Sequence, residues 1–191
     1  MLKLIRVLFV LIMLFSTSVV WAEDKKKSVL FVCTGNYFRS RFAEAVFNYY
    51  FGDGKSEWKA FSRGLKLQNL TPAQRETHVS IYSIEKMEEL QIPASFLDGQ
   101  PTQIGQKDLD HSQIVIGLNQ KEHAPMFQEL FPNYDLRNIE FWDVPDSHKG
   151  MVPTKALDLV FCNTLKLGTQ LTGIEVSDVA SERCFNSSQA L

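Results

Sequence analysis

A short apolar run that ends in a cysteine constrains the fold of this chain more than any other feature. Val29–Val32 is such a run, Cys33 follows it, and an amphipathic stretch begins at Arg41. A run of this length is typical of a strand that is buried on both faces of a parallel sheet. The sequence here predicts a strand, a tight loop and a helix.

The rest of the chain repeats this alternation of two kinds of segment. Further β-rich apolar runs lie at Lys59–Ser62, Ile114–Leu118 and Ile139–Trp142. Longer amphipathic stretches lie at Arg41–Phe51, Ala73–Leu90, Lys121–Phe131 and Lys155–Leu171. Alternating strands and helices build βαβ units. We therefore expect a single α/β domain with a central four-stranded parallel sheet and helices on both of its faces.

The N-terminal residues have the pattern of a signal peptide. Lys3 and Arg6 precede the apolar stretch Val7–Phe15, and Val20 and Ala22 place small or compact residues at the −3 and −1 positions of a signal-peptidase site. A retained membrane anchor is the alternative, but the apolar stretch breaks at Ser16–Ser18 and is shorter than the ~20 residues that span a bilayer. We expect cleavage after Ala22 and export to a periplasm or the medium, without stable membrane association afterwards.

These features divide the chain into four parts. Residues 1–22 are the expected signal peptide, 23–27 a charged lead-in, 28–179 the α/β domain and 180–191 a polar C-terminal tail. The net charge of the whole chain is −2, and removal of the signal peptide, with its two positive charges, makes it −4. A mildly acidic surface gives no reason to expect a nucleic-acid partner.

The chain has three cysteines, which are too few for a disulfide scaffold. In an exported protein Cys162 and Cys184 could pair, which would leave Cys33 free. Alternatively, Cys162 is a buried helix residue and Cys184 a thiol of the tail.

The loop after the first strand has the residue types of an oxyanion site that contains a nucleophile. Ligands of parallel α/β sheets bind at the carboxyl ends of the strands, where Cys33 lies. Loop N–H groups and the helix N-terminus attract a tetrahedral dianion, and Gly35 and Asn36 tolerate positive φ angles. The same field favours the nucleophilic thiolate, to which Ser40 can donate a hydrogen bond. Arg39 can hold two phosphoryl oxygens through its planar fork.

We therefore predict a phosphate-binding site made of Thr34, Gly35, Asn36, Tyr37, Phe38, Arg39 and Ser40. No metal is expected, because His78, His111, His123 and His148 are scattered without ligand spacing. No cofactor is expected either.

The loop resembles that of the low-molecular-weight protein tyrosine phosphatases, which reads V-C-x-G-N-x-C-R-S-P before an A-E-A helix. The matching residues are Val32, Cys33, Gly35, Asn36, Arg39, Ser40, Ala43 and Glu44. Phe38 stands where the family has a second cysteine, and Arg41 where it has proline. Weaker similarity follows at Ser62–Gly64, which looks like the family's S-A-G, and at Asp108–His123.

The resemblance also implies a general acid, an aspartate in a D-P motif after the fourth strand. Asp143 and Asp146 are the candidates, and we favour Asp146 because it lies farther along the loop, after Pro145. Asp143 is more simply a residue that orients the loop. The two tyrosines that follow this motif in the family are absent here, where Ser147, His148 and Lys149 follow, which argues against phosphotyrosine selectivity. Tyr37, Trp58 or Trp142 could supply aromatic contact instead.

Together these residues predict a cysteine-dependent phosphatase that acts through a phosphocysteine intermediate. Cys33 would attack, Arg39 would bind the phosphoryl group, and Asp146 would serve as acid and then as base. The expected partner is a phosphorylated protein, such as a phosphotyrosine protein, or a small phosphate ester. Two alternatives are a non-catalytic phosphate-binding module and a thiol-dependent arsenate reductase, although the latter needs two further cysteines for its redox relay.

Overall fold

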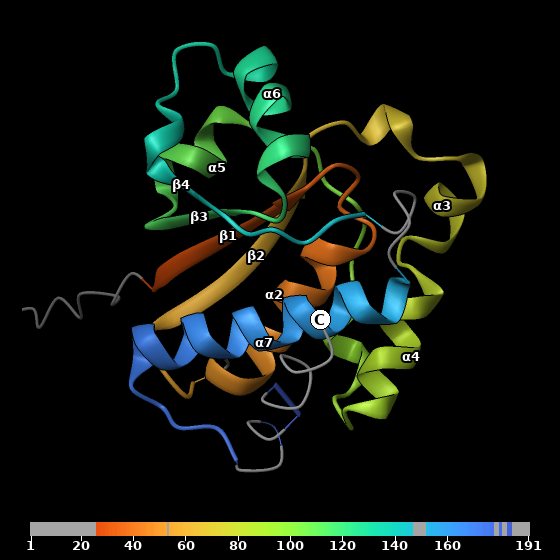
Figure 1. Ribbon diagram of the computed structural model, residues 1–191, viewed down its shortest axis with the longest axis vertical. Coiled ribbons are helices and arrows are strands. Elements are labelled where there is room, and N and C mark those ends of the chain that lie inside the picture. The colour runs from red at the N-terminus through yellow and green to blue at the C-terminus, as the bar shows by residue number, and fades with distance from the viewer. Residues whose placement is uncertain (1–25, 53, 147–151, 178–179, 181–182, 185–191) are drawn as a thin grey trace, which may run out of the picture.

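A computed structural model describes residues 26–52, 54–146, 152–177, 180 and 183–184 of the 191-residue chain (Figure 1). The expected signal peptide, residues 1–22, lies outside the described residues, as do 147–149 and most of the lead-in and tail. Among the helices that are described, none is long and apolar enough to span a membrane.

Four parallel strands form the centre of the domain, as the sequence predicts. They are β1 (Lys27–Cys33), β2 (Trp58–Gly64), β3 (Ile114–Gly117) and β4 (Ile139–Phe141). Their order in the sheet is β2-β1-β3-β4, and all three pairings are parallel. β1 begins at Lys27, which pairs with Trp58, so the last residue of the expected lead-in already belongs to the sheet.

The helices agree with the sequence in position except in two places. They are α2 (Arg39–Phe51), α3 (Pro72–Thr77), α4 (Ile81–Glu89), α5 (Gln106–His111), α6 (Gln120–Leu130) and α7 (Pro153–Thr172). The expected single helix Ala73–Leu90 is two helices, because His78 adopts a left-handed conformation, with φ of 61°, that ends α3. The short helix α5 was not expected. It has six residues, of which Leu109 is the buried one, so its sequence shows no helical periodicity.

Helices cover both faces of the sheet (Figure 1). In β1, Val29, Phe31 and Cys33 belong to the cluster that packs against α2 and α7. The alternate residues Leu30 and Val32 pack on the other side, against residues of α5 and α6. β1 is therefore buried on both faces, as its unbroken apolar run predicts, and its C-terminal end has a fixed position in the core.

Cys162 and Cys184 form a disulfide bond, and Cys33 is a free, buried cysteine. The first of the two alternatives for the cysteines therefore holds. The bond closes a loop over a sequence separation of 22 residues and attaches the start of the expected tail to α7. By the chain-entropy account, a cross-link of this length stabilises a fold by about 3 kcal/mol.

Candidate active site

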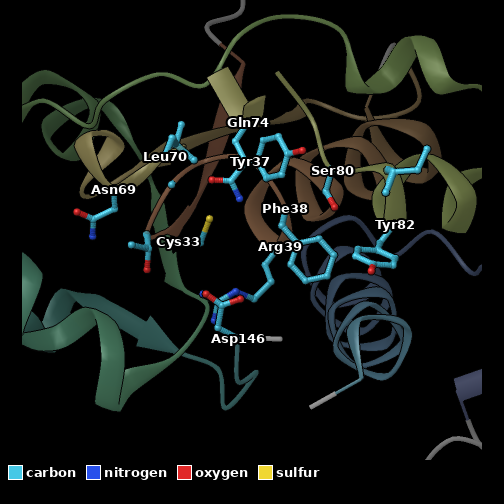
Figure 2. Close-up of a pocket in the computed structure, with 13 residues that line it drawn as sticks. Cys33, Tyr37, Phe38, Arg39, Asn69, Leu70, Gln74, Ser80, Tyr82 and Asp146 are labelled. Atoms are coloured by element: carbon cyan, nitrogen blue, oxygen red, sulfur yellow. The ribbon is translucent and has the colours of Figure 1, made fainter. Parts of the chain in front are cut away.

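Cys33 ends the central strand β1 and lines a pocket of about 420 Å³ (Figure 2). In the sheet, β2 lies on one side of β1 and β3 on the other, so the strand order changes direction at β1. Parallel α/β sheets bind their ligands at such a switch point. Of the predicted site residues, those that line the pocket are Cys33, Thr34, Gly35, Tyr37, Phe38, Arg39 and Asp146. Asn36 and Ser40 are fully buried and do not line it.

The N-terminus of α2 is open to an anion. The residue before the helix, Phe38, makes no side-chain capping bond, and the first turn contains no acidic residue. The first N–H groups of a helix have no partner within the helix and carry its positive dipole end. The loop residue Asn36 has a φ of 50°, the left-handed conformation that its residue type tolerates. Local backbone geometry therefore suits phosphate binding, as the sequence predicts.

The side-chain amide of Asn36 fixes the shape of the loop. Its nitrogen donates to Ser62 Oγ at 2.7 Å and to Ser40 Oγ at 3.1 Å. Its oxygen accepts the backbone N–H of Thr102 at 2.8 Å, which defines the orientation of the amide. One buried side chain thus connects the loop to α2, to β2 and to the segment that follows α4.

These bonds also determine the direction of the Ser40 hydroxyl. Ser62 Oγ donates to Glu44 Oε2 at 2.6 Å and accepts from Asn36, so its one hydrogen is used. Ser40 Oγ likewise accepts from Asn36, which leaves its own hydrogen for Cys33 Sγ at 3.0 Å. The sulfur therefore accepts a hydrogen bond, and a charged acceptor gains most from such a bond. Burial raises the pKa of Glu44, and the bond from Ser62 opposes that shift.

Arg39 lies beside Cys33 in a dense set of acceptors. Its Nη1 and Nη2 each donate to one oxygen of Glu122 at 3.1 Å, Nη1 also donates to the carbonyl of Val144 at 2.9 Å, and Nη2 lies 3.3 Å from Asp146 Oδ2. Burial lowers the pKa of Arg39, but the charge of Cys33 and the bond to Glu122 outweigh it and the net pKa is raised. The guanidinium is permanently charged and 2% exposed.

Glu122 is a functional candidate that the sequence analysis did not identify. Burial raises its pKa, but hydrogen bonds and charge from Arg39 and a hydrogen bond from Thr34 dominate and lower it to about 2. The Thr34 hydroxyl donates to Glu122 Oε1 at 2.6 Å. Asn119 caps α6 by accepting the backbone N–H of Glu122 at 3.0 Å. An acid three residues after an N-cap residue is a common sequence pattern, so it gave no specific signal.

The two candidate acids occupy different environments. Asp146 lines the pocket, its side chain is 22% exposed, and it contacts Arg39 (Figure 2). Asp143 instead accepts a hydrogen bond from Asn119 Nδ2 at 3.2 Å, and the two residues form an isolated antiparallel bridge. This geometry agrees with the preference for Asp146 and gives Asp143 the loop-orienting contact that the sequence analysis expected.

The rim of the pocket combines polar side chains, namely Asn69, Gln74 and Ser80, with aromatic and apolar ones. Tyr37, Phe38, Leu70, Ile81 and Tyr82 line it, and the rings of Phe38 and Tyr82 meet edge to face with centroids 6.5 Å apart (Figure 2). Ile81 and Tyr82 are 57% and 46% exposed. These two residues were not predicted, because nothing in the sequence indicates that the start of α4 approaches the loop.

The other two aromatic candidates do not line the pocket. Trp58 and Trp142 are both buried in the core. Of the three aromatic residues that the sequence analysis named, Tyr37 alone lines the pocket.

Arg41, which replaces the family's proline, has a structural role. Its Nη2 donates to the carbonyl oxygens of Leu97, Asp98 and Gly99. Burial lowers the pKa of Arg41, with opposing contributions from Glu44 and Asp98. The side chain joins the first turn of α2 to the segment after α4, so this departure from the family pattern leaves the pocket intact.

A buried cysteine in an oxyanion loop at a parallel strand end defines a class of α/β proteins that handle phosphate or related anions. A family model described as "Low molecular weight phosphotyrosine protein phosphatase" matches residues 28–160. The chain belongs to this family, whose members hydrolyse phosphomonoesters.

Solved structures show the same fold. The low molecular weight protein tyrosine phosphatase from T. tengcongensis has a TM-score of 0.60 and 25% identity, and the match covers 75% of this chain and 99% of that one. YfkJ from Bacillus subtilis has a TM-score of 0.60 and 23% identity, with 76% and 95% covered.

Curated relatives at the sequence level include arsenate reductases from Bacillus cereus and Bacillus anthracis. They are 36% identical over 62 residues, which is 30% of this chain and 44% of each relative. The match thus spans less than half the length of these relatives.

Gly64 allows β2 to approach the loop closely, and a side chain there should disturb the site. A Cβ at this position would lie 2.9 Å from the backbone nitrogen of Asn36 and 2.4 Å from Leu67 Cδ1. We expect Gly64→Ala to lower kcat/KM by about 10- to 100-fold, because small misplacements of binding groups are costly. Steady-state kinetics with p-nitrophenyl phosphate measures this.

Gly105→Ala is the matched control, since its Cβ would meet nothing closer than Asp108 Oδ2 at 3.7 Å. Its kinetics should equal those of the wild type. Equal kinetics for Gly64→Ala as well would contradict the expected shift of the loop.

Proposed function

We propose that this protein is a cysteine-dependent phosphatase with Cys33 as nucleophile, Arg39 as phosphoryl-binding residue and Asp146 as general acid and base. The observation that carries the proposal is that all three side chains line one pocket at the end of β1. Membership of the phosphatase family supports it. The loop from Thr34 to Ser40 would bind the phosphoryl oxygens through its N–H groups and the start of α2.

The first step transfers the phosphoryl group to sulfur. The Cys33 thiolate attacks phosphorus in line with the ester oxygen, a P–S bond forms, and the P–O bond to the leaving group breaks. Asp146 protonates the departing oxygen, and Arg39 stabilises charge on the equatorial oxygens. In the second step Asp146 removes a proton from water, which attacks phosphorus. The P–S bond breaks, and phosphate and the Cys33 thiolate are released.

The rim supports an aromatic or apolar substrate group next to the phosphate. Tyr37, Phe38 and Tyr82 line the pocket and offer aromatic surface to such a group (Figure 2). We infer that phosphotyrosine in a protein is preferred over small polar phosphate esters. One structural relative is an arginine phosphatase from Geobacillus stearothermophilus, so a substrate panel should contain phosphotyrosine, phosphoserine and phosphoarginine peptides.

Arsenate reduction is the second candidate, because the curated relatives at the sequence level are arsenate reductases. Thiol-dependent reduction needs a relay of two further thiols near the nucleophile, and neither Cys162 nor Cys184 lines the pocket of Cys33. This separation favours phosphate hydrolysis. Formation of arsenite from arsenate in the presence of thioredoxin or glutathione, without phosphatase activity, would favour the reductase.

Replacement of the nucleophile tests the central proposal. Cys33→Ser should lower hydrolysis of p-nitrophenyl phosphate by at least about a thousandfold, because an alcohol is not ionised at neutral pH. Phosphate binding, measured by calorimetry, should persist, since serine keeps the loop intact. Turnover equal to the wild type would sink the proposal. Phosphate binding by a wild type that hydrolyses no ester would instead indicate a non-catalytic binding module.

Replacement of each aspartate separates the two candidate acids. Asp146→Asn should lower kcat by about 100- to 10,000-fold, because both proton transfers are lost. Asp143→Asn should change kcat much less, since Asp143 contacts Asn119 rather than the pocket. The comparison is sharpest with a phenyl phosphate, whose poor leaving group depends on the acid. A loss confined to Asp143→Asn would reassign the acid.

We also propose that the mature protein works outside the cytoplasm. The apolar N-terminal segment has a signal-peptide pattern, and the Cys162–Cys184 disulfide is of a kind that persists in oxidising compartments. Full-length protein produced in a bacterial host should be recovered from the periplasm or medium with Glu23 as its first residue. Cell fractionation and N-terminal sequencing measure this, and an intact cytoplasmic chain with reduced Cys162 would oppose it.

A further inference from the structure

Glu122 places a fixed negative charge next to a site that is proposed to bind a dianion. Its side chain is 8% exposed, and its pKa of about 2 keeps it ionised at any working pH. A like charge near a phosphoryl group weakens ground-state binding. A carboxylate at this position is therefore costly for affinity, and its contacts indicate what it contributes instead.

The hydrogen bonds of Arg39 can be assigned one by one. Nη1 uses one hydrogen on Glu122 Oε2 and the other on the carbonyl of Val144. Nη2 uses one hydrogen on Glu122 Oε1 and has its second beside Asp146 Oδ2. Glu122 therefore holds the end of the guanidinium that carries Nη1 and Nη2. The edge formed by Nε and Nη2 is the one that two phosphoryl oxygens can share.

Two groups bond Glu122 directly, and a third supports both of them. The Thr34 hydroxyl donates to its Oε1, and Asn119 caps its backbone N–H. His123 Nδ1 accepts the backbone N–H of Asn119 at 3.1 Å, which leaves Nε2 with the ring hydrogen, 3.4 Å from Thr34 Oγ1. The carboxylate thus has a single position against Arg39, set by the start of α6 and the start of the loop.

We propose that Glu122 is the positioning residue for Arg39, and that it orients the Nε and Nη2 edge of the guanidinium toward the phosphoryl group. This role rests on the proposed phosphatase function and adds a residue to it. A phosphoryl oxygen that takes the second Nη2 hydrogen replaces Asp146 on Arg39. Substrate binding thereby releases Asp146 from its ion pair to reach the leaving-group oxygen.

The test separates orientation from binding. E122Q removes the negative charge of the carboxylate. It also replaces one of the two oxygens that accept hydrogen bonds from Arg39 with an NH₂ group, which is a donor and faces Nη1 of Arg39. We expect kcat to fall about 10- to 100-fold, because Arg39 is no longer aligned with the transition state. KM and the inhibition constant of inorganic phosphate should stay the same or fall, because a like charge has been removed. The pH profile should keep its shape, since Glu122 does not titrate in the working range.

Three results would overturn the proposal. The first is a kcat of E122Q within twofold of the wild type. The second is a kcat that falls together with phosphate affinity, as expected for a collapsed site. The third is the loss of one limb of the pH profile, which would make Glu122 a proton donor.

Two further variants complete the experiment. E122D keeps the charge on a shorter side chain and should have a kcat between those of E122Q and the wild type; a kcat at or below that of E122Q would contradict the proposal. If E122Q does not fold, kcat, KM and the inhibition constant of phosphate are measured on E122D instead. An unchanged kcat of E122D would then contradict the proposal. E129Q, on the exposed part of α6 where Glu129 pairs with Lys66, is the control and should match the wild type.

The outcome also separates this proposal from the proposed function. If the wild type hydrolyses no phosphate ester, the phosphatase function fails and the positioning role fails with it. If the wild type is active and E122Q matches it, the positioning role alone is wrong.

Discussion

The hydrogen bonds of the Asn36 side chain hold together the segments on which the whole site depends. They join the loop after β1 to Ser40 in α2, to Ser62 in β2 and to the backbone of Thr102. The loop can approach β2 this closely because Gly64 has no side chain. Asn36 is 1% exposed, and a buried polar side chain with all its partners in place is rigid and costly to disturb. The shape of the anion site therefore follows from the packing of the core.

The charged groups of the pocket are arranged around Arg39. Arg39 faces three acidic groups, namely Cys33, Glu122 and Asp146. Of the carboxyls, Glu122 stays ionised because Arg39 and Thr34 hold it. In the proposed mechanism, a phosphoryl group that binds Arg39 takes the place of Asp146, which is then free to reach the oxygen of the leaving group.

The sequence predicted those parts of the structure that local patterns encode. The strands, their parallel arrangement and the oxyanion loop follow from an apolar run, a glycine and an asparagine, and a helix that begins directly afterwards. Asp146 lines the pocket and Asp143 does not, while the choice of Asp146 as the acid stays a prediction. Glu122, Ile81 and Tyr82 were missed because their roles come from contacts between elements distant in sequence. The break at His78 was missed because a single left-handed residue there has no strong sequence signal.

The two sulfur sites of the chain have separate roles. Phe38 occupies the position of the family's second cysteine and packs against Tyr82 at the rim, while Cys162 and Cys184 are bonded to each other. Oxidation of Cys33 to a sulfenic acid therefore finds no thiol partner within the chain, and further oxidation leads to acids that thiols do not reduce. Burial of the Cys33 side chain and its bond to Ser40 limit access of oxidants to the sulfur. In a protein proposed to work outside the cytoplasm, protection of the proposed nucleophile thus depends on the burial of Cys33, because the chain offers it no free thiol partner.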